Sequence, residues 1–230
     1  MKKNFSLPGQ GLVEYVLIIL LIAIAVMLAV KASGINLTAV YCNIIKGLGG
    51  NSGTCSSSLF SDDFNNLNNW KIISGNWAVK NGHLCGGPNE GRIFANVNST
   101  GNYVINLNGA TLSKGNGYGL YFNSSNYSAV NGYDFQYDPG YGSGAYLLRE
   151  WYQGNELSPS ATVYAPKGYN WNQSHNIQMI VSNNTYTAYV DGTKVYQAAD
   201  STYPSGSGIG LRTWDSTQVC FDSISVNPLP

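Results

Sequence analysis

The sequence predicts an α+β protein in which a long apolar N-terminal helix precedes an all-β remainder. Residues 12–30 form an apolar run in which Glu14 is the only charged residue. Residues 49–58 are almost entirely Gly, Asn, Ser and Thr, which is the composition of a flexible linker. From residue 59 onward, short alternating apolar and polar stretches recur between turn-forming residues, as in a β-sandwich or barrel.

The N-terminal helix is expected to be long enough to cross a membrane. At about 1.5 Å per residue, the run of residues 12–30 spans roughly the 30 Å hydrocarbon core of a bilayer. A charge inside such a segment is costly and is retained where it has a partner or a function, so Glu14 requires an explanation. Apolar residues continue at three- and four-residue spacing from Leu37 to Leu48, and the glycines that follow predict the helix end there.

The entrance to this helix carries a specific order of residues. A short basic leader precedes Gly9, and Glu14 and Tyr15 follow it immediately before the apolar run. This order resembles the class III leader of type IV pilins, in particular the Flp/Tad-type pilins. The resemblance implies that a prepilin peptidase cuts after Gly9, so that Gln10 becomes the first mature residue and Glu14 and Tyr15 the fifth and sixth.

The same resemblance implies a filament. Residues 1–9 would be the cleaved leader, and residues 10–48 would lie in the inner membrane before packing, with copies of the chain, into the core of an extracellular pilus. Glu14 would pair with the α-amino group of a neighbouring subunit and so set the axial register. The implied partners are other copies of the chain, the prepilin peptidase and the pilus assembly machinery.

Two alternatives for the N-terminal segment remain open. Val30-Lys31-Ala32 before Ser33 has the small-x-small form of a secretory cleavage site. Against a signal peptide, the apolar run is longer than the usual h-region and contains a glutamate. The second alternative is an uncleaved membrane anchor that carries a surface domain. Neither alternative accounts for the order of residues around Gly9.

The remainder of the chain has clear strand and hairpin signals. Residues 103–107 alternate between apolar and other side chains, as do several later stretches. Asp191-Gly192 between residues 186–190 and 193–197 predicts a two-residue β-hairpin. The length is ample for one sizeable core.

Several stretches near the two ends of this segment carry a second resemblance. They are residues 60–64 with Trp70, 75–82, 189–192, 208–212 and 221–226. Together they resemble the concanavalin A-like jelly roll, within the group of laminin-G-like and related sugar-associated domains. The resemblance implies an antiparallel jelly-roll sandwich over residues 59–230, and it bears on fold more than on function.

The sequence predicts no enzyme, no cofactor and no metal site. Glucanases of this fold resemble one another in carrying Glu-x-Asp-x-x-Glu along one strand, and this chain has no such cluster. Glu150 and Glu156 have the wrong spacing, and no glutamate joins Asp134 and Asp138. The two histidines lie far apart in sequence and match no metal-ligand pattern.

Binding of surface glycans is the more plausible role for the β-domain. The chain has 17 Tyr and 5 Trp, and aromatic rings beside amides suit stacking on sugars. The alternative is that these rings fill the core. A charged fraction of 10% with zero net charge argues against nucleic acid as a partner. The expected ligand contacts, placed on predicted loops, are Tyr137, Tyr141, Tyr169 and Trp171.

Four cysteines in an exported chain predict two disulfides, for which three pairings exist. Cys42–Cys55 and Cys85–Cys220 are preferred, because the second would join an early strand to the last one, and these are commonly neighbours in this fold class. Glycosylation sequons begin at six positions, which are Asn36, Asn98, Asn123, Asn126, Asn172 and Asn183.

The sequence as a whole therefore predicts a structural pilus subunit whose helix builds the filament core and whose sandwich is displayed outside for adhesion. One alternative is a membrane-anchored or secreted carbohydrate-binding β-sandwich protein that does not polymerise. The other is a minor pilin that acts as an adhesin at the tip.

Overall fold

A computed structural model describes residues 14–22, 58–125 and 128–229. The chain divides into two compact units, Met1–Cys55 and Ser56–Pro230. Each unit is described by itself.

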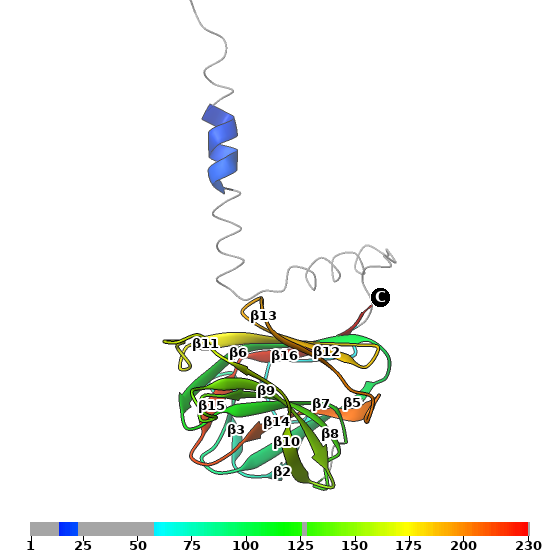
Figure 1. Cartoon of the computed structure of the whole chain (residues 1–230). Helices are drawn as coiled ribbons and strands as arrows, with labels where there is room; N and C mark the ends of the chain where they lie inside the picture. The colour runs from blue at the N-terminus through cyan, green and yellow to red at the C-terminus, as the bar shows by residue number, and fades with distance from the viewer. Residues whose placement is uncertain (1–13, 23–57, 126–127, 230) are drawn as a thin grey trace, which may run out of the picture. The chain divides into compact units, whose positions relative to one another are not determined.

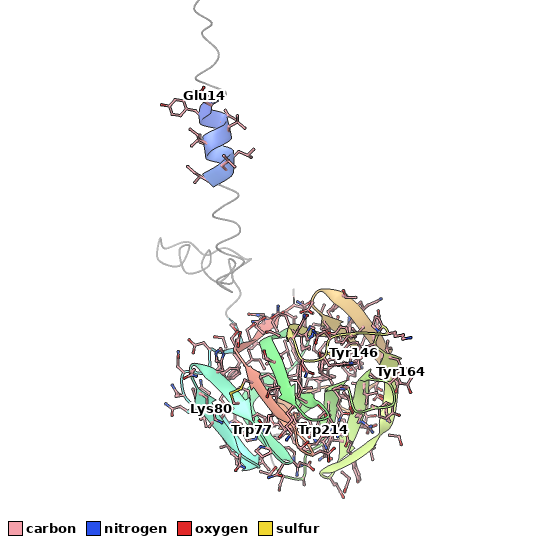
Figure 2. All side chains as sticks on the ribbon, turned by 90° about the vertical axis from the view of Figure 1, so that its left-hand side faces the viewer. Glu14, Trp77, Lys80, Tyr146, Tyr164 and Trp214 are labelled. Atoms are coloured by element: carbon pink, nitrogen blue, oxygen red, sulfur yellow. A yellow bond between two sulfur atoms is a disulfide. The ribbon has the colours of Figure 1, made fainter. Side chains whose placement is uncertain are left out.

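In the N-terminal unit, residues 14–22 form an α-helix whose side chains are all exposed. Glu14 lies at its start (Figure 2). The predicted helix of residues 10–48 is thus seen in one segment, and its remainder, together with Gly9, Gln10 and the linker up to residue 57, lies outside the described residues. Within the described ranges, no helix has the length and apolarity that crossing a membrane would require.

The second unit is an antiparallel β-sandwich of two sheets, as the sequence predicts. Sheet A has nine strands. They are β1 (Phe60–Asp62), β3 (Trp77–Lys80), β4 (His83–Gly86), β6 (Tyr103–Lys114), β11 (Ser174–Ser182), β12 (Thr185–Val190), β13 (Thr193–Ala199), β15 (Gln218–Phe221) and β16 (Ser223–Pro228).

Sheet B has seven strands, in the spatial order β10-β9-β8-β7-β14-β5-β2. Their bounds are β2 (Trp70–Ser74), β5 (Gly91–Ser99), β7 (Tyr118–Ser124), β8 (Gly132–Asp138), β9 (Ala145–Tyr152), β10 (Asn155–Tyr164) and β14 (Gly206–Thr213).

The core lies between the two sheets, which Figure 1 shows as stacked layers with β6, β11 and β16 in one and β7, β8 and β9 in the other. Because side chains alternate along a strand, every second residue of the central strands points into this layer. In β6 these are Tyr103, Ile105 and Leu107, all wholly buried. The alternation predicted for residues 103–107 is thereby confirmed.

The predicted hairpin is also confirmed, because β12 pairs with β13 through Asp191 and Gly192. Both residues have positive φ, 50° and 77°, as a type I′ turn requires. The aspartate accepts this conformation because its carboxylate also receives the backbone N–H of Asn176 at 2.9 Å.

One disulfide joins Cys85 in β4 to Cys220 in β15, which is the pairing preferred from the sequence. The two residues are directly opposite each other in the β4–β15 ladder. Since Leu84 and Phe221 on either side belong to the core, the disulfide lies on the outer face of sheet A. Cys42 and Cys55 lie outside the described residues.

Candidate functional site

The outer face of sheet B carries polar side chains that are buried, although residues on the outer face of a sandwich are usually exposed to solvent. Strand β8 is buried along its whole length, although only one of its faces meets the core. Its side chains alternate with period two. Tyr133, Phe135 and Tyr137 point into the core, and Asp134, Gln136 and Asp138 point to the outer face.

Strand pairing brings residues that are distant in sequence beside Asp134. Asp134 lies opposite Arg149 of β9 and Tyr121 of β7. Two residues further along β8, Gln136 lies opposite Gly119 of β7, and Gly119 lies opposite Arg212 of β14. Two arginines and one aspartate therefore meet on one face of the sheet.

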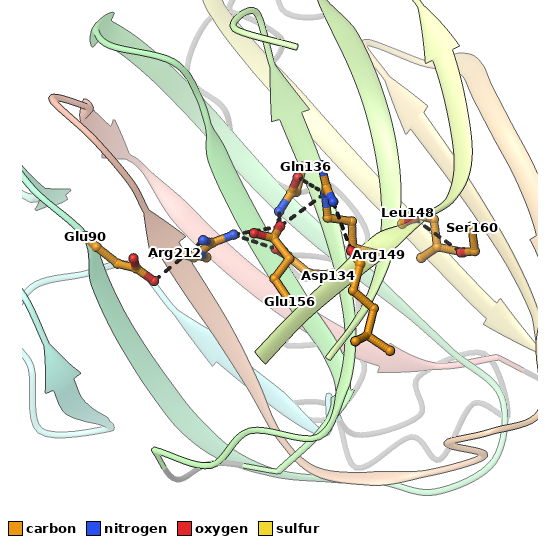
Figure 3. A network of polar contacts seen from close by, with 9 residues as sticks. Glu90, Asp134, Gln136, Leu148, Arg149, Glu156, Ser160 and Arg212 are labelled. Atoms are coloured by element: carbon orange, nitrogen blue, oxygen red, sulfur yellow. Dashed lines mark hydrogen bonds and ion pairs between the residues drawn. The ribbon is translucent and has the colours of Figure 1, made fainter. Parts of the chain in front are cut away.

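Glu156, at the start of β10, connects these groups (Figure 3). One of its carboxylate oxygens lies 3.0 Å from Nη1 of Arg212 and 3.1 Å from Nε of Arg149, and it also accepts a hydrogen bond from Gln136. Gln136 donates from the same nitrogen to Asp134 at 2.9 Å. Each member is thus held by at least two neighbours, so the arrangement is rigid.

Arg212 is the centre of the network. Its guanidinium carbon lies 4.6 Å from the ring centre of Trp151 and 4.9 Å from that of Trp214. Its second terminal nitrogen lies 3.5 Å from Glu90. Cation–π contact with two rings, combined with the ion pairs, fixes the plane of the guanidinium.

Gly119 provides the room for this arrangement. A Cβ at this position would lie 2.4 Å from Oδ1 of Asp134, which is closer than real contacts allow. Its φ is ordinary, so the glycine is required for space and not for backbone conformation.

Burial shifts the titration of the carboxyl groups. Asp134 is 0% exposed, and burial raises its pKa to about 7, with Arg212 opposing the shift and Glu156 adding to it. Burial also raises the pKa of Asp138, to about 6. Burial alone would lower the pKa of Arg212, but Tyr121, Asp134 and Glu156 raise it above its usual value.

Several polar atoms of this face are buried and have no hydrogen-bond partner within the described part of the chain. Such atoms are uncommon in folded proteins, because an unsatisfied buried donor or acceptor costs about 1–3 kcal/mol. Those on this face are Arg92 Nε, Tyr121 Oη, Asp134 Oδ1, Trp151 Nε1 and Arg212 Nε.

An open pocket of about 260 Å³ lies over the network. Its lining combines acidic, basic, amide and aromatic side chains. The lining residues are Glu90, Gln136, Asp138, Arg149, Glu156, Arg212, Trp214 and Asp215. We call this hollow the sheet B pocket.

A larger hollow, of about 530 Å³, lies beside the disulfide, where it is lined by Trp77, Lys80, Cys85 and Cys220 among others. Figure 2 labels Trp77 and Lys80 at this edge of the domain. Lys80 is the single charged side chain of its lining, and none of its lining residues has a buried polar side-chain atom without a partner. The sheet B pocket is therefore the better candidate despite its smaller volume.

The aromatic residues predicted to contact a ligand divide between two places. The prediction that Tyr137 lies in a loop and contacts a ligand is wrong. Tyr137 lies in β8, is 0% exposed and donates a hydrogen bond to the carbonyl of Trp171. Tyr169 and Trp171 pack against the core around it. Tyr141 is half-buried and lies beside the pocket, with its ring centre 5.6 Å from the guanidinium carbon of Arg149.

His175 belongs to the aromatic group around Tyr137 and not to the pocket. Its ring is almost fully buried, and its two nitrogens lie 2.6 Å from Asp191 and 2.9 Å from the carbonyl of Asn170. Within the described residues, no group of three or more His, Cys, Asp or Glu side chains is arranged to hold a metal ion.

The sequon positions also differ from one another. Asn123 is 2% exposed, and its side-chain amide is hydrogen-bonded to Tyr103 and Tyr203. The prediction of a glycosylation site at Asn123 is therefore wrong. Asn98, Asn172 and Asn183 are exposed. Asn36 and Asn126 lie outside the described residues.

The pocket does not follow from the spacing of carboxylates along any one strand of the sequence. Asp134 and Asp138 share the pocket region with Glu156 only because β8, β9 and β10 are neighbours in sheet B. A signal was present, since residues 133–138 alternate aromatic and polar side chains in the middle of the domain.

A sequence model of the family described as the 3-keto-alpha-glucoside-1,2-lyase-like domain matches residues 56–227. The chain belongs to this family. The match covers the whole sandwich and leaves the N-terminal unit outside it. No curated protein matches the chain in sequence.

Solved structures similar to this lyase-like domain share its fold at low sequence identity. The carbohydrate-binding module CBM66 from Bacillus subtilis has 22% identity over 67% of this chain and 94% of its own, with a TM-score of 0.58. The exoplasmic/lumenal domain of VIP36, in a form bound to Ca²⁺ and Man3GlcNAc, has 12% identity over 75% and 89%, with a TM-score of 0.60.

A third structure comes from work on endo-acting O-glycanases that members of the human gut microbiota express to initiate mucin breakdown. It has 14% identity over 76% of this chain and 100% of its own, with a TM-score of 0.55. At these identities the three structures establish the concanavalin A-like sandwich and leave the ligand open.

Proposed function

We propose that the β-sandwich is a carbohydrate-binding domain and that the sheet B pocket is its ligand site. The observation that carries this proposal is the rigid network of Arg149, Arg212 and Glu156 beside the ring of Trp214, with buried polar atoms that lack partners. A sugar presents hydroxyl groups that both donate and accept hydrogen bonds, together with an apolar ring face. The pocket offers acceptors, donors and an aromatic ring side by side.

The fold relatives support this proposal, because one is a carbohydrate-binding module and another is a domain in a form bound to Ca²⁺ and Man3GlcNAc. Pre-organisation supports it as well. Because the arginines are already held by ion pairs and aromatic contacts, little side-chain entropy would be lost when a ligand binds.

The family description raises catalysis as a competitor, and the pocket supports binding better. A lyase needs a base that touches a proton of its substrate. Asp134 has a pKa of about 7, which suits a base, but its carboxyl is wholly buried beneath the network. Glu156 is more exposed, but both arginines and Gln136 already hold it.

The experiment is an oligosaccharide array probed with the full chain in detergent, followed by titration of the strongest member. Trp214→Ala should weaken binding about tenfold, because it removes the stacking ring from the pocket. Tyr164→Ala is the matched control, since Tyr164 is 55% exposed and does not line the pocket (Figure 2). Equal losses in both variants, or no bound sugar at all, would contradict the proposal. Cleavage of the bound sugar would favour the lyase.

We propose further that the N-terminal unit places this domain at the cell surface as part of a pilus. The observation behind this is the helix of residues 14–22, in which every apolar side chain from Val16 to Ile22 is more than half exposed. Such a surface needs a cover of lipid or of neighbouring helices. The order Gly9, Glu14, Tyr15 favours neighbouring helices in a filament.

The N-terminal residue of protein sheared from cells tests this second proposal. A start at Gln10, within filaments visible by electron microscopy, is the expected result. A start at Ser33 would mean that the segment is a discarded signal peptide, and the domain would then be a secreted binding protein.

A further inference from the structure

The acidic and basic side chains that line the sheet B pocket differ in number and in how free they are to contact a ligand. Its lining holds four carboxylates but only two guanidinium groups. The carboxylates are those of Glu90, Asp138, Glu156 and Asp215. At neutral pH the lining is therefore net negative.

Both guanidinium groups are already held in ion pairs, although the Nε of Arg212 has no hydrogen-bond partner in the described part of the chain. Arg212 points one terminal nitrogen at Glu156 and Asp134 and the other at Glu90, and the rings of Trp151 and Trp214 lie over it.

Arg149 donates its Nε to Gln136, with Glu156 beside it, and a terminal nitrogen to the carbonyl of Leu157. Its guanidinium also lies over the ring of Tyr141. A bidentate pair with an incoming carboxylate or sulfate needs two parallel N–H groups. At Arg149, such a pair through Nε would displace Glu156 and Gln136, and one through the terminal nitrogens would compete with the carbonyl of Leu157.

Two carboxylates, in contrast, have no ion pair among the described residues. They are Asp138, which is 8% exposed, and Asp215, whose Oδ2 accepts a hydrogen bond from Asn116 at 2.9 Å. Below the pocket, Asp134 is wholly buried with Oδ1 unpartnered. Among the charged groups that line the pocket, the carboxylates of Asp138 and Asp215 are therefore the ones without a counter-ion in the described residues.

We infer that the sheet B pocket selects sugars by charge, binding amino sugars and uncharged sugars and rejecting uronic, sialic and sulfated ones. The inference rests on the proposed sugar-binding function and gives it a ligand class. Protonated amines and hydroxyl groups supply the donors that the unpaired carboxylates accept. An acidic group would meet these carboxylates, whereas both guanidinium groups are already paired with Glu156.

The test uses the full chain in detergent on an array in which each scaffold is present in neutral, amino and acidic forms. The expected order of affinity is amino, then neutral, then acidic, with about two- to fivefold between successive classes at low salt. The differences should shrink in 0.5 M NaCl, because exposed charges are screened. Equal binding of acidic and neutral forms would overturn the inference and leave sugar binding intact. An array without any bound member would remove both.

A variant pair sharpens the test. Glu90→Gln removes one carboxylate from the lining and releases a nitrogen of Arg212, so acidic sugars should gain about two- to fivefold. Glu150→Gln is the matched control, because Glu150 lies on the opposite face of β9 and does not line the pocket. If both variants, or neither, change the binding of acidic sugars, the selection does not come from this pocket.

Discussion

The two outer faces of the sandwich use polar side chains in different ways. On sheet A, Gln178 donates to Asn106 at 2.9 Å and Asn108 donates to Ser223 at 3.0 Å, which forms a ladder of neutral groups across β11, β6 and β16. On sheet B, charged groups are packed between strands and rings, and several of their atoms lack partners. Neutral groups that hydrogen-bond to one another stabilise a surface, whereas buried charged groups with unsatisfied hydrogen-bonding atoms are typical of a functional site.

Removing Arg212 should produce the largest difference between the faces. Arg212→Ala leaves the buried Asp134 without its nearest cation and Glu156 with Arg149 alone, which is expected to lower the free energy of unfolding by about 3–5 kcal/mol. Thermal or denaturant unfolding of the full chain measures this. A loss below about 1 kcal/mol would show that the network is not coupled to the fold.

The titration of Asp134 should tie stability to pH on the sheet B side. Its pKa is about 7 in the folded protein against 3.8 for an ordinary aspartate, so the folded state holds a proton that the unfolded state has lost between these values. Stability is therefore expected to fall as pH rises from about 4 to about 7, by up to about 1.4 kcal/mol per pH unit.

Asp134→Asn removes this titratable carboxyl group and should make the free energy of unfolding depend less steeply on pH. Asp138, with a pKa of about 6, leaves a residual slope in the same direction over the narrower range from about pH 4 to about pH 6. Chemical denaturation at a series of pH values distinguishes the two chains, and an unchanged slope would contradict the assignment to Asp134.

Filling the space at Gly119 should have an intermediate effect. Gly119→Ala places a methyl group against Asp134, which is expected to cost about 1–3 kcal/mol and to weaken sugar binding by displacing the carboxyl network. Melting temperature and array binding are the measurements. A stable variant with unchanged binding would mean that the network is more plastic than its packing indicates.

The smallest effect is expected on sheet A. Asn106→Ala breaks the neutral ladder and should cost about 0.5–1.5 kcal/mol, with no change in sugar binding. This variant is the reference for the other three. If it reduced binding as much as Gly119→Ala, the distinction between the two faces would be lost.

The sequence predicted the sandwich, the Asp191-Gly192 hairpin and the Cys85–Cys220 bond because each depends on a local signal or on general properties of the fold. It did not predict the pocket, whose members lie at positions 90 to 215 and meet only through the strand order of sheet B. Tyr137 shows the same limit, since its turn-rich surroundings predicted a loop while its position in β8 buries it.

The Cys85–Cys220 bond has a consequence for the fate of the domain outside the cell. The cysteines are 135 residues apart, and the loop they close includes every residue that lines the sheet B pocket. A protease that cuts one exposed turn within this loop would nick the chain without releasing either piece. Nicked domains would stay in place on the surface, and the two fragments would separate on a denaturing gel only after reduction.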